Sequence, residues 1–211
     1  MSAVEFVDGG VTAPKGFVAA GLHVGFRHDP NRRDASLVFS QVEDTVAAGT
    51  FTQNVFCAAP VKLSRKVAQS GHARAVILNS GTANAATGKP GDEAALKQQQ
   101  LTAQALGIEQ DEVFVASTGV IGVQLPMGPF ETGLPKLAET LSDSREAATD
   151  AAKGIMTTDT VSKECTAIFE IDGVSYAIGG MSKGSGMIQP NMATMLAVLT
   201  TDAAVEKGAL K

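Results

Sequence analysis

Apolar runs alternate with short polar turns along the first third of the chain. Residues 17–26 and 36–42 are mainly apolar, and residues 50–56 continue the pattern after a second polar stretch. Short apolar runs between turn-forming residues predict β-strands, and this spacing favours an antiparallel meander. Residues 73–78 form a further apolar run, which predicts a buried strand.

Helical periodicity follows in the middle of the chain. The predicted helices cover residues 61–68, 92–107, 134–141 and the alanine-rich stretch up to residue 154. Asp92 and Asp143 stand where N-cap residues are preferred, so we expect each to cap the helix after it. A short strand is expected at residues 113–116.

A β-hairpin is the strongest local signal. Asp172-Gly173 separates two strand-like segments, 165–171 and 174–179, and this dipeptide favours a two-residue hairpin turn. A last apolar run begins at residue 192, and Asp202 is expected to cap a terminal helix from residue 203. The mixture of strands and helices predicts the α/β class, as a layered α/β sandwich with mixed and antiparallel sheets.

Composition narrows the functional classes. The chain has 211 residues, 44% of them hydrophobic, which is enough for a substantial core. A net charge of −5, one Tyr and no Trp disfavour nucleic-acid binding. No apolar run reaches the length of a membrane span and the N-terminus does not resemble a signal peptide, so we expect a cytoplasmic protein without a membrane partner. The charged residues of 27–34 are expected to form a solvated turn.

Metal and disulfide chemistry is not expected. Cys57 and Cys165 are far apart and predict small buried apolar side chains. The three histidines, at positions 23, 28 and 72, lack the spacing of metal ligands.

Three loops rich in small residues carry the candidate chemistry. They are residues 79–88, 117–122 and 182–194, each beside an apolar strand. Such loops can offer backbone N–H groups to a phosphate or a developing oxyanion, although ordinary tight turns have the same composition. None has a P-loop ending or a dinucleotide-binding fingerprint, which disfavours a nucleotide binder.

Thr194 ends the third loop and is either a good strand former or a nucleophile. As a nucleophile it needs a base. Scission of the Ala193–Thr194 bond would supply one, because a free α-amine has a pKa of about 7.7–8.0. The small Ala193 and the flexible loop before it permit such a step.

Residues 183–202, from Lys-Gly-Ser-Gly-Met-Ile-Gln-Pro-Asn-Met-Ala-Thr onwards, resemble the self-cleavage segment of the glutamate N-acetyltransferase / ornithine acetyltransferase family of arginine biosynthesis. The loops at 79–88 and 117–122, the Thr-Thr-Asp sequence at 157–159 and residues 11–16 are similar to further motifs of that family. The resemblance extends from about residue 9 to the end of the chain.

The resemblance implies a precursor cut between Ala193 and Thr194. The new N-terminal Thr194 would accept acetyl from N2-acetylornithine and pass it to L-glutamate. Thr118 and Gly119 match the oxyanion-stabilising positions. Thr157, Lys183 and Thr194 match substrate-contacting positions, although a lysine on a loop is ordinarily solvated. Some members also use acetyl-CoA as donor, and no cofactor is implied.

The family fold is similar in outline to N-terminal-nucleophile hydrolases. Its members assemble from two α and two β chains, so residues 1–193 correspond to the α-chain region and residues 194–211 to the start of the β chain. Thr82 and Ala86 replace the usual Asn and Cys of the 79–88 motif. Because most of the β chain is missing, we expect this chain to be inactive alone. The alternative is a non-catalytic, fold-related fragment that keeps the motifs.

Overall fold

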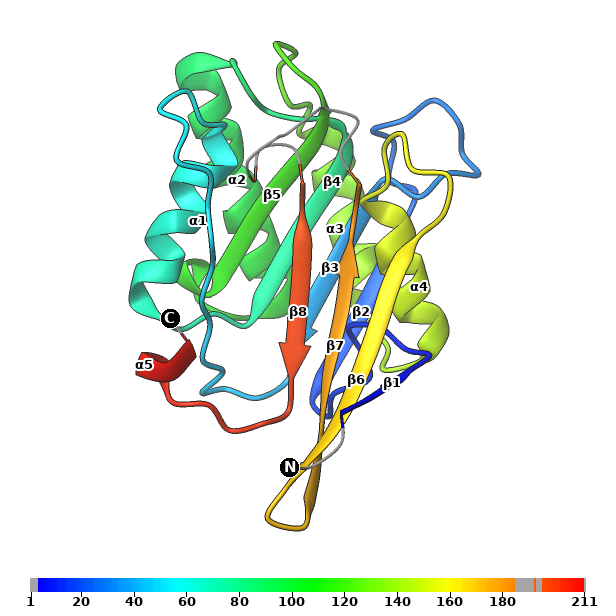
Figure 1. The fold of residues 1–211 in the computed structure, drawn as a ribbon. Helices are drawn as coiled ribbons and strands as arrows, with labels where there is room; N and C mark the ends of the chain where they lie inside the picture. The colour runs from blue at the N-terminus through cyan, green and yellow to red at the C-terminus, as the bar shows by residue number, and fades with distance from the viewer. Residues whose placement is uncertain (1–3, 185–191, 193–194, 211) are drawn as a thin grey trace.

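Two four-stranded sheets form the framework of the molecule (Figure 1). The computed structural model describes residues 4–184, 192 and 195–210. The first sheet has the order β2 (Phe17–Leu22), β3 (Ala35–Ser40), β4 (Ala75–Thr82), β5 (Val113–Val120). The second has the order β1 (Glu5–Val7), β6 (Lys163–Ile171), β7 (Val174–Ser182), β8 (Ala197–Thr201). Neighbours in both sheets are antiparallel except β4 and β5, which are parallel. The predicted layered α/β fold with mixed and antiparallel sheets is confirmed.

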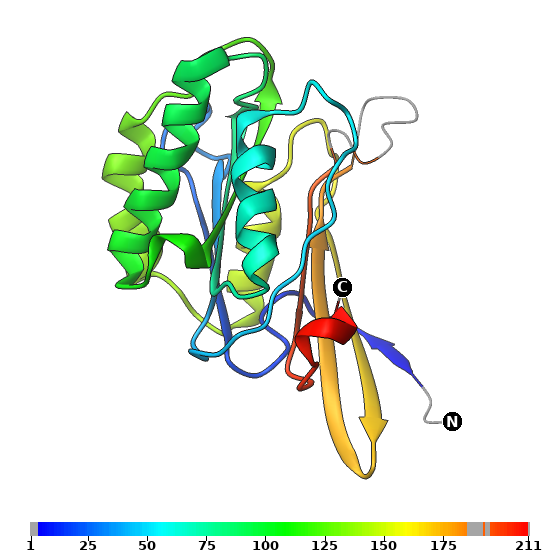
Figure 2. The same ribbon diagram turned by 90° about the vertical axis from the view of Figure 1, so that its left-hand side faces the viewer.

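Helices cover the first sheet on one face, and a helix and the second sheet cover the other. The helices are α1 (Ala59–Ser70), α2 (Gly88–Leu106), the 3-10 turn η1 (Gln110–Glu112), α3 (Gly128–Glu139), α4 (Arg145–Gly154) and α5 (Lys207–Leu210). Figure 2 shows α2 and α3 on one side of the first sheet and the second sheet on the other. Leu37 and Ile77 belong to the core with α2 and α3, whereas Val38 and Leu78 belong to the core with α4, β7 and β8. Because successive strand residues point to opposite faces, burial on both faces explains the continuous apolar runs of β3 and β4.

The predicted hairpin is confirmed. Asp172 has φ +52° and Gly173 has φ +80°, as a two-residue turn of type I′ requires. The turn sets the register of β6 and β7, which pair from Ile171–Val174 up to Lys163–Ser182.

The strand expected at residues 50–56 is wrong. The structure describes this whole segment and gives it no strand. Thr52 Oγ1 accepts a hydrogen bond from Asn54 N at 3.2 Å, and Asn54 Oδ1 accepts one from Phe56 N at 2.9 Å. These local bonds replace the ladder bonds of a strand.

The three expected helix caps are also wrong. Helix α2 begins at Gly88, so Asp92 lies inside it and pairs with Lys62 at 3.1 Å. Ser144, one residue after Asp143, caps α4 by accepting from Ala147 N at 3.1 Å. Asp202 accepts instead from Ala177 N and Lys15 N, and the terminal helix begins only at Lys207.

The two cysteines, both in the described part of the chain, are free. Cys165 is exposed, against expectation, because its side of β6 belongs to the outer face of the second sheet. None of the helices within the described residues is long and apolar enough to cross a membrane.

Candidate functional site

The parallel pair β4 and β5 positions two of the candidate loops. Parallel strands end at the same edge of a sheet, and here Ser80 pairs with Thr118 and Gly81 with Gly119. Gly119 has φ +133°, and a Cβ on it would overlap the carbonyl group of Gly81. Thr118 beside it is buried. The two predicted oxyanion residues therefore lie in a fixed backbone arrangement that requires glycine.

Backbone hydrogen bonds join the loop at 79–88 to the loop at 117–122. Ala83 N donates to Val120 O at 2.9 Å, and Gly122 N donates to Ala85 O at 2.9 Å. Asn84, fully buried with φ +48°, donates through Nδ2 to Gly91 O at 2.9 Å and so holds the first loop against α2. These loops are more than isolated tight turns, because each fixes the other.

Lys183 is buried at the end of β7, so the ordinary expectation of a solvated lysine is wrong. The residue is 3% exposed, and its Nζ donates to Gly184 O at 2.7 Å. Burial lowers the pKa of Lys183, the Asp159 carboxylate raises it, and the Lys163 ammonium lowers it further, with a net lowering. A buried cation of this kind suits the carboxylate of a small substrate.

Asp159 lies beside both Thr157 and Lys183. Its Oδ2 accepts from Thr157 N at 3.2 Å, and its Oδ1 accepts from Gly184 N and from Lys163 Nζ, each at 2.6 Å. Burial raises the pKa of Asp159, but the hydrogen bonds from Lys163 and the two backbone N–H groups outweigh burial and lower this pKa to about 2. Asp159 is therefore a fixed negative charge near neutral pH.

The charged stretch at 27–34 is a solvated turn in its middle, where residues 28–32 are exposed as expected, but Arg27 and Arg33 are half-buried and Asp34 is buried. Asp34 is fully buried, and its carboxylate accepts from the backbone N–H groups of Val24 at 2.7 Å and Arg27 at 2.9 Å. Arg27 donates through Nε to Ser80 Oγ at 3.2 Å and through a terminal nitrogen to Met156 O at 2.6 Å. Arg32 donates to Thr157 O at 3.0 Å. The arginines thus connect the end of β4 to the segment that carries Thr157.

All these groups lie at one end of the two sheets. Figure 1 shows the carboxyl ends of β4, β5 and β7 and the start of β8 on the same side of the molecule. Ala193 and Thr194 lie outside the described residues. Leu196, two positions after Thr194, accepts a hydrogen bond through its carbonyl from Lys183 N at 3.0 Å. The segment that follows the predicted scission point thus lies beside Lys183.

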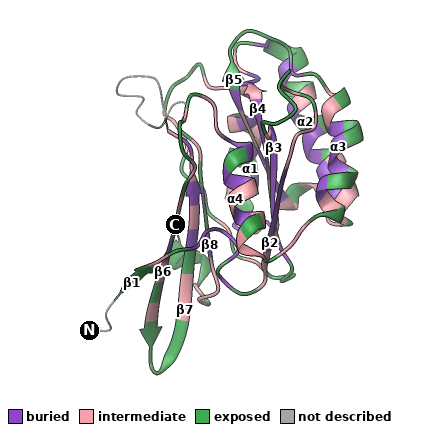
Figure 3. Cartoon of the chain, turned by 90° about the vertical axis from the view of Figure 1, so that its right-hand side faces the viewer, coloured by how far each residue is buried: buried purple, intermediate pink, exposed green. Residues whose placement is uncertain are grey.

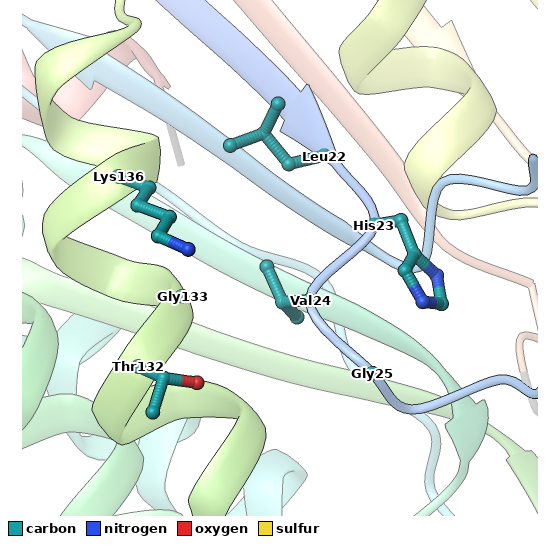
Figure 4. A pocket seen from close by; sticks show the side chains of 7 residues that line it. All are labelled: Leu22, His23, Val24, Gly25, Thr132, Gly133 and Lys136. Atoms are coloured by element: carbon teal, nitrogen blue, oxygen red, sulfur yellow. The ribbon is translucent and has the colours of Figure 1, made fainter. Parts of the chain in front are cut away.

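A surface pocket borders the backbone that holds Asp34, since Val24, a donor to that carboxylate, lines it. Leu22, His23, Val24 and Gly25 line it on one side, and α3 lines the other side (Figure 4). It includes none of the predicted site residues. Across the residues that the structure describes, no three His, Cys, Asp or Glu side chains gather as a metal site would require.

A model of the ArgJ family matches residues 18–211, nearly the whole chain. The chain belongs to the ArgJ family. The arginine biosynthesis bifunctional protein ArgJ of Symbiobacterium thermophilum is 49% identical over 209 residues, which are 99% of this chain and 51% of that protein. The chloroplastic ArgJ protein of Sorghum bicolor is 49% identical over 94% of this chain and 43% of its own length. The chain thus spans about half the length of the curated relatives it matches.

Solved structures of ArgJ proteins share the fold. The ArgJ crystal structure from Bacillus halodurans superposes with a TM-score of 0.86 at 37% identity, over 92% of this chain and 100% of that chain. The ornithine acetyltransferase of Mycobacterium tuberculosis, complexed with ornithine, superposes with a TM-score of 0.84 at 38% identity, over 90% of this chain and 100% of that one.

Sequence reasoning missed Arg27, Asp34 and the role of Asp159. Asp34 carried a usable signal, since it directly precedes an apolar strand, and a polar group buried there needs hydrogen-bond partners. For Arg27 the signal was absent, because its partner Met156 is 129 positions away.

Proposed function

We propose that the complete protein is a self-cleaving acetyltransferase that transfers acetyl from N2-acetylornithine to L-glutamate through Thr194. The observation that carries the proposal is the juxtaposition of Thr157, Asp159 and the buried Lys183 in a member of the ArgJ family. The same end of the molecule carries Thr118 and Gly119 (Figure 1). An ammonium for the substrate carboxylate and rigid donors for an oxyanion are two requirements of acyl transfer between amino acids.

The chemistry follows from a nucleophile that is also an N-terminus. The Thr194 hydroxyl attacks the Ala193 carbonyl carbon and the Ala193–Thr194 C–N bond breaks, which frees the α-amine and leaves an ester on the Thr194 oxygen. Water then hydrolyses this ester to restore the hydroxyl and to leave Ala193 with a carboxylate. That amine takes the hydroxyl proton as Thr194 attacks the acetyl group of the donor. Thr118 and Gly119 stabilise the tetrahedral oxyanion, and ornithine leaves with the proton. The amine of glutamate then attacks the acetyl ester, the bond to the Thr194 oxygen breaks, and the proton that the amine loses restores the Thr194 hydroxyl.

Lys183 and Thr157 are the proposed substrate contacts. The reaction so described needs no cofactor, and acetyl-CoA would enter only as an alternative acetyl donor. The cytoplasm is the proposed location for this chain, although the relative from Sorghum bicolor is named as chloroplastic.

A second chain from the same precursor is the proposed partner. Residues 1–193 would form the α chain, and residues 194–211 would begin the β chain. The proposed assembly contains two α and two β chains.

The outer face of the second sheet, defined by Phe6, Ala167, Ile178 and Leu199, supports this partner. Phe6 and Leu199 are each 74% exposed, and β8 is an edge strand. Figure 3 shows much of β1 and β6 exposed while the first sheet is buried. Large exposed apolar side chains and open strand edges favour association.

Two variants of the full-length protein test the nucleophile. Thr194→Ala removes the hydroxyl, so both scission and acetyl transfer should fall by at least ~10⁴-fold. Thr194→Ser keeps a hydroxyl and should retain part of both. Intact mass measures scission, and transfer from N2-acetylornithine to labelled glutamate measures activity.

The result that would overturn the proposal is scission of Thr194→Ala at the normal rate. A wild-type precursor that stays whole and transfers no acetyl would favour the non-catalytic alternative. The 211-residue chain alone serves as the control, because we expect no transfer without the second half.

A further inference from the structure

One buried carboxylate lies between the two segments that carry the proposed substrate contacts. Thr157 stands in the loop between α4 and β6, and Lys183 stands at the end of β7. Asp159 accepts from the N–H of Thr157 and from the N–H of Gly184, which is the residue after Lys183. The two segments are thus joined through a single side chain across 25 positions of sequence.

The position of this carboxylate is well determined. The side chain of Asp159 is 2% exposed, and its partner Lys163 is 44% exposed. The Lys163 ammonium and the Gly184 N–H both reach Oδ1 at 2.6 Å, slightly shorter than the roughly 2.7–2.9 Å usual for charge-assisted N–H···O bonds. Lys163 therefore neutralises the carboxylate from the solvent side, while the backbone donors orient it from inside.

We propose that Asp159 is a positioning residue, an inference that rests on the function proposed above. Its carboxylate holds Thr157 and the Lys183–Gly184 peptide in the arrangement that substrate binding and self-cleavage both require. Asp159 acts through Thr157 and Lys183 and is assigned no contact with the reacting atoms. Gly184 opens the stretch of sequence that leads to the Ala193–Thr194 bond, so the same carboxylate also anchors the start of that stretch.

A charge effect distinguishes this role from a purely structural one. The charged groups that act on Lys183 are Asp159, which raises its pKa, and Lys163, which lowers it. If Lys183 binds a substrate carboxylate as a cation, binding weakens as pH rises through the pKa of Lys183. Removing Asp159 lowers this pKa and moves the loss of binding to lower pH. Removing Lys163 moves it to higher pH.

The test compares Asp159→Asn with Lys163→Gln in the full-length precursor. For Asp159→Asn we expect scission to slow by about tenfold or more, because a buried backbone donor loses its acceptor. The alkaline limb of kcat/KM for N2-acetylornithine should move down by roughly 1 pH unit. Lys163→Gln keeps the carboxylate and its two backbone bonds, so scission should stay near the wild-type rate while the alkaline limb moves up.

Alkaline limbs that coincide with wild type in both variants would overturn the inference, as would normal scission in Asp159→Asn. If Asp159→Asn does not fold, the alkaline limb of kcat/KM in Lys163→Gln still tests the inference. A limb that does not move to higher pH would contradict the charge effect on Lys183. A wild-type protein that cleaves but transfers no acetyl would count against the proposed function alone, and the scission rates of the two variants would still test the role of Asp159.

Discussion

Gly119 shows how strongly one residue constrains the proposed oxyanion site. Its φ of +133° lies in a region that side chains rarely adopt, and the backbone of Gly81 occupies the space where a Cβ would be. Because β4 and β5 pair in register up to Thr82 and Val120, this close approach cannot relax without disturbing the ladder. The orientation of Thr118 therefore depends on glycine at position 119, because any side chain there would overlap the backbone of Gly81.

We predict that Gly119→Ala costs at least ~3 kcal/mol of the free energy of unfolding, because φ strain and backbone overlap act together. Gly122→Ala is the matched control. Gly122 has φ +81°, but beyond its chain neighbours no atom lies within 4 Å of the place that a Cβ would take. Its cost should therefore be only about 1–2 kcal/mol. Urea unfolding of both variants measures the difference, and equal losses would contradict this account.

At the scale of elements, the sequence predicted what local chemistry determines. The Asp172-Gly173 turn fixes its hairpin with two positive φ values, and the apolar runs of β3 and β4 reflect burial on both faces. The expected strand at 50–56 failed because Thr52 and Asn54 bond to nearby backbone groups.

Distant partners explain the other failures. The expected cap at Asp202 failed because its carboxylate accepts from Ala177 N, 25 positions away. The residues of the candidate site fall into the same two groups. The loop motifs were visible in sequence, whereas the contacts of Arg27 and Asp159 form only when distant segments meet.

Ser64 joins α1 to the edge strand β5. Its hydroxyl donates to Val115 O at 2.7 Å and accepts from Val115 N at 2.9 Å, and all three groups are buried. We predict that Ser64→Ala costs about 1–3 kcal/mol, because both backbone groups lose their partner. Ser175→Ala, on an exposed position of β7, should change stability by less than ~0.5 kcal/mol. Thermal unfolding compares the two, and a Ser64→Ala variant as stable as Ser175→Ala would contradict the prediction.

At the scale of the whole molecule, the two sheets differ in how completely they are covered. The first sheet is buried on both faces, by α2 and α3 on one side and by α4 with β7 and β8 on the other. The second sheet is buried only toward α4, and its outer face carries Phe6 and Leu199. An exposed apolar face of this kind favours packing against another polypeptide, and the proposed β chain is the partner that we expect there.

We predict that Leu199→Lys weakens co-purification of this chain with the separately expressed remainder of the precursor by about tenfold, since a charge would then be buried at the contact. Val55→Lys is the control, because Val55 is 100% exposed and belongs to the segment between β3 and α1 and not to the second sheet. Equal recovery of the two variants would show that the remainder packs elsewhere.

The attachment of β8 has a consequence for what a chain break would do. Five residue pairs join β8 to β7, and Thr200 Oγ1 donates to Val11 O at 2.8 Å across most of the sequence. A cut before residue 194 would therefore divide the polypeptide without dispersing its pieces. The segment that follows the cut would stay held by the sheet, with Leu196 O still bonded to Lys183 N, in the way that a linker holds a second binding group near its site. Hydrogen bonds between β7 and β8 would thus hold the two pieces together after the peptide bond is cut.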